Sequence, residues 1–132
     1  MEMTLDSAKK VVEAAENKAK DIGVPMNIAV VDKGGNLVAF ERMDDAWLGS
    51  INIAINKAFT AVAFNMTTED LGAESKPEKS LFGIHATNEG RLVIFGGGIP
   101  LRKGDNLIGA IGVSGGAVLQ DIEVAEAGEK AF

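Results

Sequence analysis

The sequence predicts an α+β fold, a five-stranded and mainly antiparallel sheet flanked by helices, formed by a single domain over residues 1–132. Helical periodicity of apolar residues occurs near both ends of the chain and once in its middle. Short β-branched apolar runs occur in pairs joined by turn residues. Because short connections join antiparallel neighbours, two such hairpins separated by a helix predict an antiparallel sheet packed by helices.

The first helix is predicted over Leu5 to Ile22, because apolar residues recur there at intervals of three and four. Thr4 is suited to cap its N-terminus, and Gly23 is a helix stop signal. The next two apolar runs, Met26–Val31 and Leu37–Met43, are joined by DKGGN, a composition typical of a hairpin turn.

A second helix is predicted over Trp47 to Asn65, starting near Gly49 or Ser50. Apolar residues cover most of its circumference, so we expect it to be buried on most sides, against the sheet and against another subunit. Lys57 is the only cation within it. Two interpretations stay open: the ammonium reaches solvent along the helix surface, or it points into a binding site.

The connection from Asn65 to Gly90 is less regular. Thr67 and Thr68 precede two acidic residues and predict a short capped helix, and Ser75 is suited to begin another. A polar connection of this length is more often functional than accidental in a compact domain. It contains the single histidine, His85, a candidate ligand for iron or haem.

Three strands and a helix complete the predicted fold. The strands are expected at Arg91–Phe95, Leu101–Lys103 and Leu107–Val113, and the helix at Ala117–Lys130. The residues of this last helix expected to point inward are Val118, Leu119, Ile122 and Ala125.

Eight of the sixteen glycines lie between Gly96 and Gly116. This clustering indicates positive φ angles or close backbone approach, required either by packing or by a ligand or second subunit against the bare backbone. The stretch GVSGG fits a nucleophile-elbow pattern around Ser114, but the only histidine precedes the serine and no base follows it. We interpret Ser114 as a helix N-cap beside amides that suit an anion.

Composition excludes several classes of function. The net charge of -6 argues against nucleic acid or an anionic membrane as partner. The absence of cysteine excludes disulfides, thiolate metal sites and cysteine nucleophiles. No run approaches the roughly 20 apolar residues of a membrane span, and the N-terminus has no signal-peptide core, so we expect a cytoplasmic protein without a membrane partner.

Several separated stretches resemble one known family. They are VPMNIAVVDKGGNLVAFERMDDA, INIAINKAFTA, GGGIPL and LIGAIGVSGG with the following QDIEVAEAG, and they cover most of the chain. In them the chain is similar to the GlcG/HbpS-like family, which includes HbpS proteins, GlcG of glycolate operons and the C-terminal domain of PduO-type corrinoid adenosyltransferases. The resemblance implies a five-stranded antiparallel sheet with helices on its faces, assembly into dimers or larger rings, and haem binding in some members.

The resemblance also implies where a pocket lies. By matching position, its candidate residues are Arg42, Lys57, Ser114 and the turn formed by Gly97, Gly98, Ile99 and Pro100. The sequence departs from its relatives in two places. The hairpin has Asn36 where relatives often have histidine, and the first helix lacks the histidine that ligates haem in some of them. Haem ligation by histidine would therefore fall to His85.

Three functional hypotheses follow. The first is a homo-oligomeric protein whose cleft, between the glycine turn, the end of the Arg42 strand and the start of the last helix, binds a small anionic ligand such as haem through Arg42 or Lys57. The alternative is an enzyme or accessory protein acting on a small carbonyl or carboxylate, with Lys57, Asp32 or Glu69 as acid or base. The third is a structural oligomer whose glycines serve packing alone.

Overall fold

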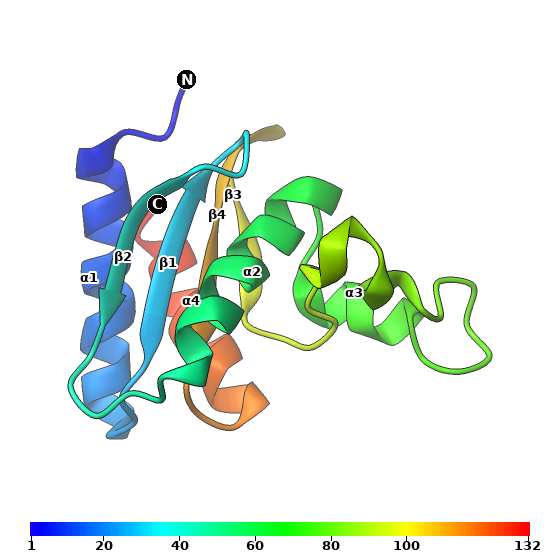
Figure 1. Ribbon diagram of the computed structural model, residues 1–132. Helices are drawn as coiled ribbons and strands as arrows, with labels where there is room; N and C mark the ends of the chain where they lie inside the picture. Colours follow the sequence, from blue (N-terminus) through cyan, green and yellow to red (C-terminus); the bar gives the residue numbers. More distant parts are fainter.

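The computed structural model describes all 132 residues as a sheet with helices on both faces and one segment that projects from them (Figure 1). The helices and strands follow one another in this order: α1 (Leu5–Ile22), β1 (Asn27–Asp32), β2 (Leu37–Arg42), α2 (Gly49–Phe64), α3 (Thr68–Glu74), β3 (Gly98–Lys103), β4 (Asn106–Ser114) and α4 (Val118–Lys130). Two short 3₁₀ turns, Ile84–Ala86 and Asn88–Gly90, lie between α3 and β3.

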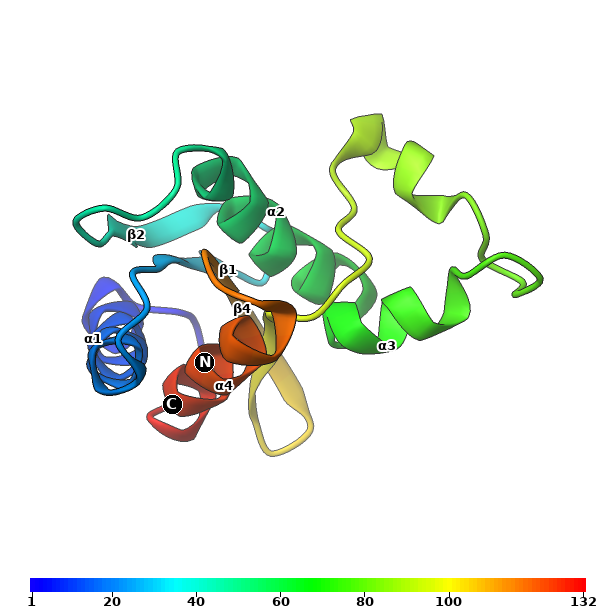
Figure 2. The same ribbon diagram turned by 90° about the horizontal axis from the view of Figure 1, so that it is seen from below.

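The sheet is antiparallel throughout, with the strand order β2-β1-β4-β3. Helices α1 and α4 cover one face and α2 covers the other (Figure 2). Side chains alternate between these faces along β1: Ile28 and Val30 pack under α1 and α4, whereas Ala29 and Val31 pack under α2. Small residues on the α2 side, among them Ala110 and Gly112 of β4, let α2 approach the sheet closely, so a Cβ at Gly112 would overlap the Ala54 carbonyl.

The bounds predicted for α1 are confirmed, because its start and stop signals are local. The Thr4 hydroxyl accepts a hydrogen bond from the Ser7 amide at 3.0 Å and so caps the helix N-terminus. Gly23 ends the helix in the left-handed conformation at φ 71°. The hairpin that follows is also confirmed, with the Asp32 carboxylate accepting hydrogen bonds from the amides of Gly34 and Asn36.

The sheet has four strands, so the prediction of a fifth strand at Arg91–Phe95 is wrong. This segment runs against helices instead. The Val93 amide donates to the Thr60 hydroxyl at 3.0 Å, and a Cβ at Gly72 would overlap the Ile94 carbonyl. A short apolar run is buried equally well by a helix as by a neighbouring strand, and periodicity does not distinguish the two cases.

Residues 75–90 form a projecting segment, here called the arm, which extends to the right in Figure 1. The helix predicted to begin at Ser75 does not form. Positive φ angles at Glu78, Gly83, Asn88 and Glu89 break the segment into turns, because a right-handed helix does not accommodate them. No helix of the protein is both long enough and apolar enough to cross a bilayer.

Candidate functional site

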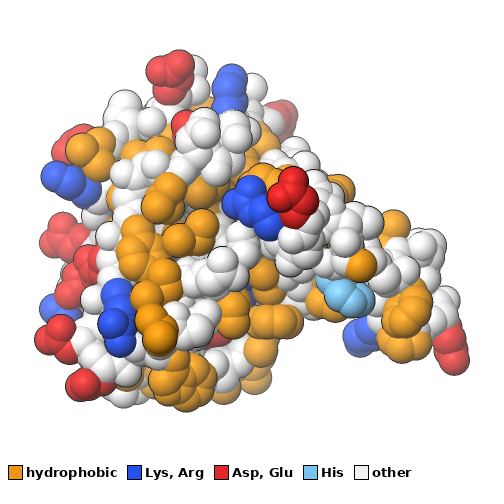
Figure 3. All heavy atoms as spheres, in the orientation of Figure 1, with side chains coloured by type: hydrophobic (Ala, Val, Ile, Leu, Met, Phe, Trp, Pro, Cys, Tyr) orange, Lys and Arg blue, Asp and Glu red, His pale blue; other side chains and the backbone are white.

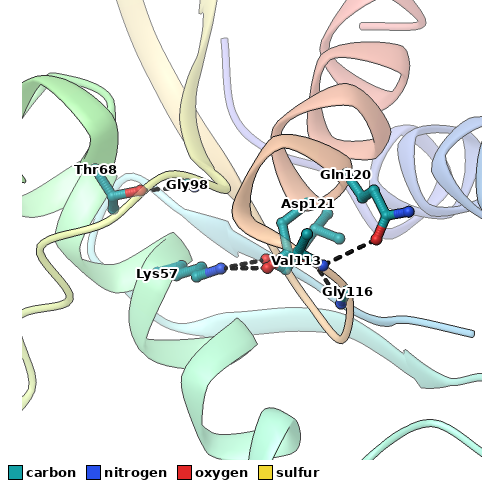
Figure 4. A network of polar contacts seen from close by, with 8 residues as sticks. Lys57, Thr68, Gly98, Val113, Gly116, Gln120 and Asp121 are labelled. Atoms are coloured by element: carbon teal, nitrogen blue, oxygen red, sulfur yellow. Dashed lines mark hydrogen bonds and ion pairs between the residues drawn. The ribbon is translucent and has the colours of Figure 1, made fainter. Parts of the chain in front are cut away.

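Lys57 lies in the middle of α2 and is completely buried, so the interpretation that its ammonium reaches solvent is wrong. Its Nζ donates a hydrogen bond to the Val113 carbonyl at 2.8 Å and forms an ion pair with the Asp121 carboxylate at 2.9 Å (Figure 4). The Lys57 chain therefore ties α2 to the end of β4 and to the first turn of α4.

Asp121 is the partner that sequence reasoning missed. It is 3% exposed, and its second carboxylate oxygen accepts a hydrogen bond from the Gly116 amide at 2.9 Å. The predicted inward face of α4 is confirmed at Ala125 and wrong at Val118 and Leu119, which are 42% and 77% exposed. The buried positions of the helix are Asp121, Val124, Ala125 and Gly128. These positions recur at intervals of three and four residues, which is the spacing of a buried helix face. The sequence did not predict this face, because one of its residues is acidic and the others are small.

Burial disfavours the charged forms of Lys57 and Asp121, and their close contact opposes this effect. Burial lowers the pKa of the Lys57 ammonium, and the nearby Asp121 carboxylate opposes this shift. Burial raises the pKa of Asp121, opposed by Lys57 and by the amides of Gly115 and Gly116. The Phe95 ring also lies over the ammonium, with its centroid 5.1 Å from Nζ. An ion pair removed from water is stable only while each charge keeps its partner and its hydrogen bonds.

The consecutive glycines pack around this pair. Gly97 has φ 126°, and a Cβ there would lie 2.7 Å from the Lys57 ammonium and 2.5 Å from the Val113 carbonyl oxygen. The Gly98 amide donates to the Thr68 hydroxyl at 2.9 Å (Figure 4). The prediction of a turn over Gly97 to Pro100 is wrong beyond Gly97, because Gly98, Ile99 and Pro100 are buried residues of β3.

Ser114 is the last residue of β4 and is buried, so its interpretation as a helix N-cap is wrong. The N-cap of α4 is Ala117, whose amide donates to the Gln120 side chain at 2.9 Å. Two more residues, Gly115 and Gly116, separate the strand from that cap. The structure thus brings Lys57, Gly97 and Gly98 together, with their own atoms filling the space between them.

Arg42 lies far from the glycines, on the opposite edge strand of the sheet. Its guanidinium donates from Nε and Nη2 to the Ala46 carbonyl, at 3.1 and 2.9 Å, and so closes the loop before α2. The strands β1 and β4 separate it from Gly98 and Ile99. Arg42 instead lines a groove between α1 and β2 together with Glu16, Lys20, Pro25, Glu41, Met43 and Asp44.

Two carboxyl groups in that groove share a hydrogen bond. Partial burial, followed by the hydrogen bond with Glu16, raises the pKa of Glu41 to about 7. The hydrogen bond with Lys20, whose Nζ lies 2.8 Å from the carboxylate, lowers the pKa of Glu16. The pKa values of the two adjacent carboxyls are thus shifted in opposite directions. Sequence alone did not predict the pair, because its members lie 25 residues apart on a helix and a strand.

A second cleft opens where the arm leaves the body, here called the arm cleft. Its volume is about 510 Å³. Residues of α3, the arm, the segment before β3 and the start of α4 line it: Glu69, Gly72, Ala73, Ser75, Lys76, Pro77, Phe82, His85, Ile94, Phe95, Gly96 and Val118. His85 is exposed and visible on the arm in Figure 3. The arm cleft is open, has aromatic and aliphatic walls, and contains a histidine and a lysine.

The three residues suggested as acid or base, Lys57, Asp32 and Glu69, do not lie together in one site. Asp32 is held within the β1–β2 turn, where its partial burial is outweighed by hydrogen bonds from Asn36 and Gly34 that lower its pKa. Glu69 lines the arm cleft, whereas Lys57 is enclosed beside Asp121. No group of three or more His, Asp or Glu side chains is arranged to hold a metal ion.

Comparison with known proteins places these features in a family. A family model described as haem degrading protein HbpS-like matches residues 3–130. An uncharacterised 15.0 kDa protein from the dhaT-dhaS intergenic region of Citrobacter freundii is 47% identical over 94% of this chain and 87% of its own. The corrinoid adenosyltransferase PduO of the same organism is 36% identical over 96% of this chain, which spans only 38% of that protein. A solved PduOC–heme complex superposes with a TM-score of 0.96 at 34% identity, covering 100% of this chain and 96% of that one.

Proposed function

The chain belongs to the HbpS-like family, and on this premise we propose that it binds haem, or a planar anionic ligand of similar shape, in the arm cleft. The observation that carries the proposal is that the only histidine of the chain lines this cleft beside two phenylalanines. A volume of about 510 Å³ is within the range of small-molecule and cofactor sites. A solved relative of the same fold carries haem.

The donor set of the cleft fits haem. Proteins hold haem iron through His, Cys, Met or Tyr. This chain has neither Cys nor Tyr, and none of its five methionines lines the arm cleft. His85 is therefore the residue there that is able to supply an axial nitrogen. When bound, haem supplies redox chemistry at its iron, and the protein supplies the position and surroundings of that iron.

The other walls suit the remaining parts of such a ligand. Phe82 is 63% exposed and Phe95 is 43% exposed, so each presents apolar area that a flat macrocycle would cover. Lys76 gives the cleft a positive charge for a carboxylate, as a propionate requires. Ile94 and Val118 complete the apolar lining, and the Lys57–Asp121 pair behind Phe95 holds that wall in place.

Titration with hemin tests this proposal. We expect a shifted Soret band at one hemin per chain, and loss of that band position in His85→Ala. Asn88→Ala is the matched control, because Asn88 is an exposed arm residue that does not line the cleft. Lys76→Ala is expected to weaken hemin binding several-fold while the Soret position stays unchanged. Absence of a Soret shift in the natural protein, or an unchanged spectrum in His85→Ala, would remove this site assignment.

We also propose that the protein is a homo-oligomer. The chain exposes large apolar side chains on its arm and at the start of α2, including Phe82, Trp47 and Leu48, which is 75% exposed. Exposed apolar side chains of this size on a small domain indicate interaction surfaces. Light scattering of the purified protein measures the mass directly, and a mass of 13.8 kDa at every concentration would contradict self-association.

A further inference from the structure

We propose that the outer edge of β2, with the groove that α1 forms along it, binds an extended segment of a partner protein. The segment adds a strand to the sheet and places a basic side chain beside Glu16 and Glu41. This edge lies across the sheet from the arm (Figure 1), so the inference does not depend on haem binding. It assigns the protein a peptide partner in addition to a small ligand.

The first observation is that β2 leaves backbone hydrogen-bonding groups unpaired along its outer edge. β2 is the first strand in the order β2-β1-β4-β3, so β1 is its only neighbour in the sheet. The Met43 amide donates to the Met26 carbonyl at 3.0 Å, and this bond sets the alternation along the antiparallel pair. By that alternation Glu41 bonds to β1, whereas the N–H and C=O groups of Phe40 and Arg42 point away from the sheet.

The opposite edge of the sheet is protected against strand addition. By the same alternation, Gly98 and Pro100 of β3 direct their backbone outward. The Gly98 amide already donates to the Thr68 hydroxyl at 2.9 Å, and Pro100 has no N–H to donate. By contrast, β2 contains no proline, and all 6 of its residues are at least partly exposed. The two edges therefore differ, and β2 is the one that is open to pairing.

The groove beside this edge has the length of one strand. Helix α1 lies along β2 (Figure 1), and the groove between them has a volume of about 710 Å³. Its α1 wall extends from Leu5 to Lys20, which is roughly 22 Å at the helical rise per residue. A strand of six residues spans roughly 20 Å. The groove therefore suits an extended chain, and the outward groups of β2 suit main-chain pairing with it.

The walls of the groove indicate which side chains such a segment carries. Leu5 and Val12 give the α1 wall an apolar part, which suits an aliphatic side chain. Glu16 is paired with Lys20 at 2.8 Å, so Glu41 has no ion pair of its own. The other charged side chains that line the groove are two cations and two carboxylates: Lys9, Arg42, Glu13 and Asp44. The excess charge is therefore negative and lies at Glu41, where a basic side chain supplies the counter-charge.

Amide hydrogen exchange followed by NMR tests the pairing directly. The probe is a capped hexapeptide, Val-Thr-Val-Thr-Lys-Thr, whose valine and lysine side chains share one face of a strand. Saturating peptide is expected to slow exchange of the Phe40 and Arg42 amides by roughly tenfold or more. The Gly98 amide, already bonded on the opposite edge, is the internal control and is expected to stay unchanged.

Two results of the exchange experiment would overturn the proposal. The first is unchanged exchange at Phe40 and Arg42 with millimolar peptide. The second is slow exchange of these amides without peptide that becomes slower as the protein concentration rises, because a second copy of the chain would then occupy the edge.

A matched pair of variants tests whether the backbone of β2 makes the contact. Phe40→Pro removes an outward N–H and is expected to weaken peptide binding by roughly tenfold, because an edge strand tolerates proline where its N–H faces solvent. Phe40→Ala removes the same side chain, keeps the N–H, and is expected to bind within about twofold of the natural protein. Circular dichroism verifies that both are folded. Equal affinities of the two folded variants would contradict main-chain pairing.

Exchanging the peptide lysine for glutamate tests the charge of the partner. The glutamate peptide is expected to bind roughly tenfold more weakly to the natural protein. Glu41→Gln should reduce that difference to about threefold or less, whereas Glu126→Gln, an exposed acidic position on α4, should preserve it. If the natural protein bound both peptides equally, the assignment of a basic partner would be wrong.

Discussion

The surroundings of Lys57 and the arm cleft contain similar residue types and have opposite character. Both combine a cation, a phenylalanine and neighbouring glycine, and both include positions that suggested a ligand site in the sequence. The Lys57 ammonium is bonded to the Val113 carbonyl and the Asp121 carboxylate, and the side chain is completely enclosed. In the arm cleft, Lys76 and His85 are exposed and bordered by half-exposed aromatic rings. A concentration of charge and glycine therefore indicates a structural contact as readily as a binding site, and exposure distinguishes the two.

The largest expected effect comes from removing the lysine of the buried pair. Lys57→Met should lower the free energy of unfolding by about 3–5 kcal/mol, because it leaves the Asp121 carboxylate buried without its partner. Urea unfolding followed by circular dichroism measures the change. Combining it with Asp121→Leu should cost less than the sum of the two single substitutions. A loss below about 1 kcal/mol in Lys57→Met would place this pair with the weak surface ion pairs.

A matched pair of glycine substitutions gives the next largest effect. Gly97 and Gly83 both have positive φ, 126° and 92°, but a Cβ at Gly97 would meet Lys57 and Val113 whereas one at Gly83 has open space. Gly97→Ala should cost about 2–4 kcal/mol, and Gly83→Ala about 1 kcal/mol from backbone strain alone. Thermal unfolding of both variants measures the difference. Equal losses would show that packing around Lys57 contributes nothing beyond the φ angle.

The groove between α1 and β2 is intermediate in burial between the enclosed Lys57 and the open arm cleft, because Glu41 is only partly buried. Its pKa is raised to about 7 in the folded protein from an ordinary value of 4.5. A carboxyl with a raised folded pKa favours the folded state while it is protonated, so its contribution is lost as pH rises from about 4.5 to about 7. Glu41→Gln should therefore match the natural protein near pH 4 and exceed it in stability above pH 7. Unfolding midpoints across this range test the sign, and a parallel pH profile in the two proteins would contradict it.

The smallest expected effect on stability belongs to the arm cleft. His85→Ala should change the free energy of unfolding by less than about 0.5 kcal/mol, because the side chain is exposed and forms no hydrogen bond or ion pair within the chain. The same substitution should abolish the hemin Soret shift. Thermal unfolding without ligand measures the first quantity, and a loss above about 1 kcal/mol would indicate that His85 has a structural role in the arm.

Local signals predicted the elements whose boundaries are set by neighbouring residues. Thr4 and Gly23 marked the ends of α1, the turn around Asp32 marked the hairpin, and Thr67 marked the start of α3. Caps and turns act over three or four residues, so the sequence contains all of the interactions that they need.

The candidate site depended on contacts between residues far apart in the chain. Lys57 and Asp121 are 64 residues apart, and neither periodicity nor composition paired them. The apolar run at Arg91–Phe95 suits burial against helices as well as burial within a sheet. Its contacts with α2 and α3 decided that it is not a strand. The arm cleft likewise exists only because His85, Phe95 and Val118 are brought together from three separate segments.

The sequence by itself therefore determined the antiparallel α+β class, the first helix and hairpin, and the family. The tertiary structure decided the number of strands, the burial of Lys57 against Asp121, and the position of His85 in an open cleft. The physical reason is range: helical periodicity, capping and turns act between near neighbours, whereas burial and charge pairing depend on which distant segments share the same space.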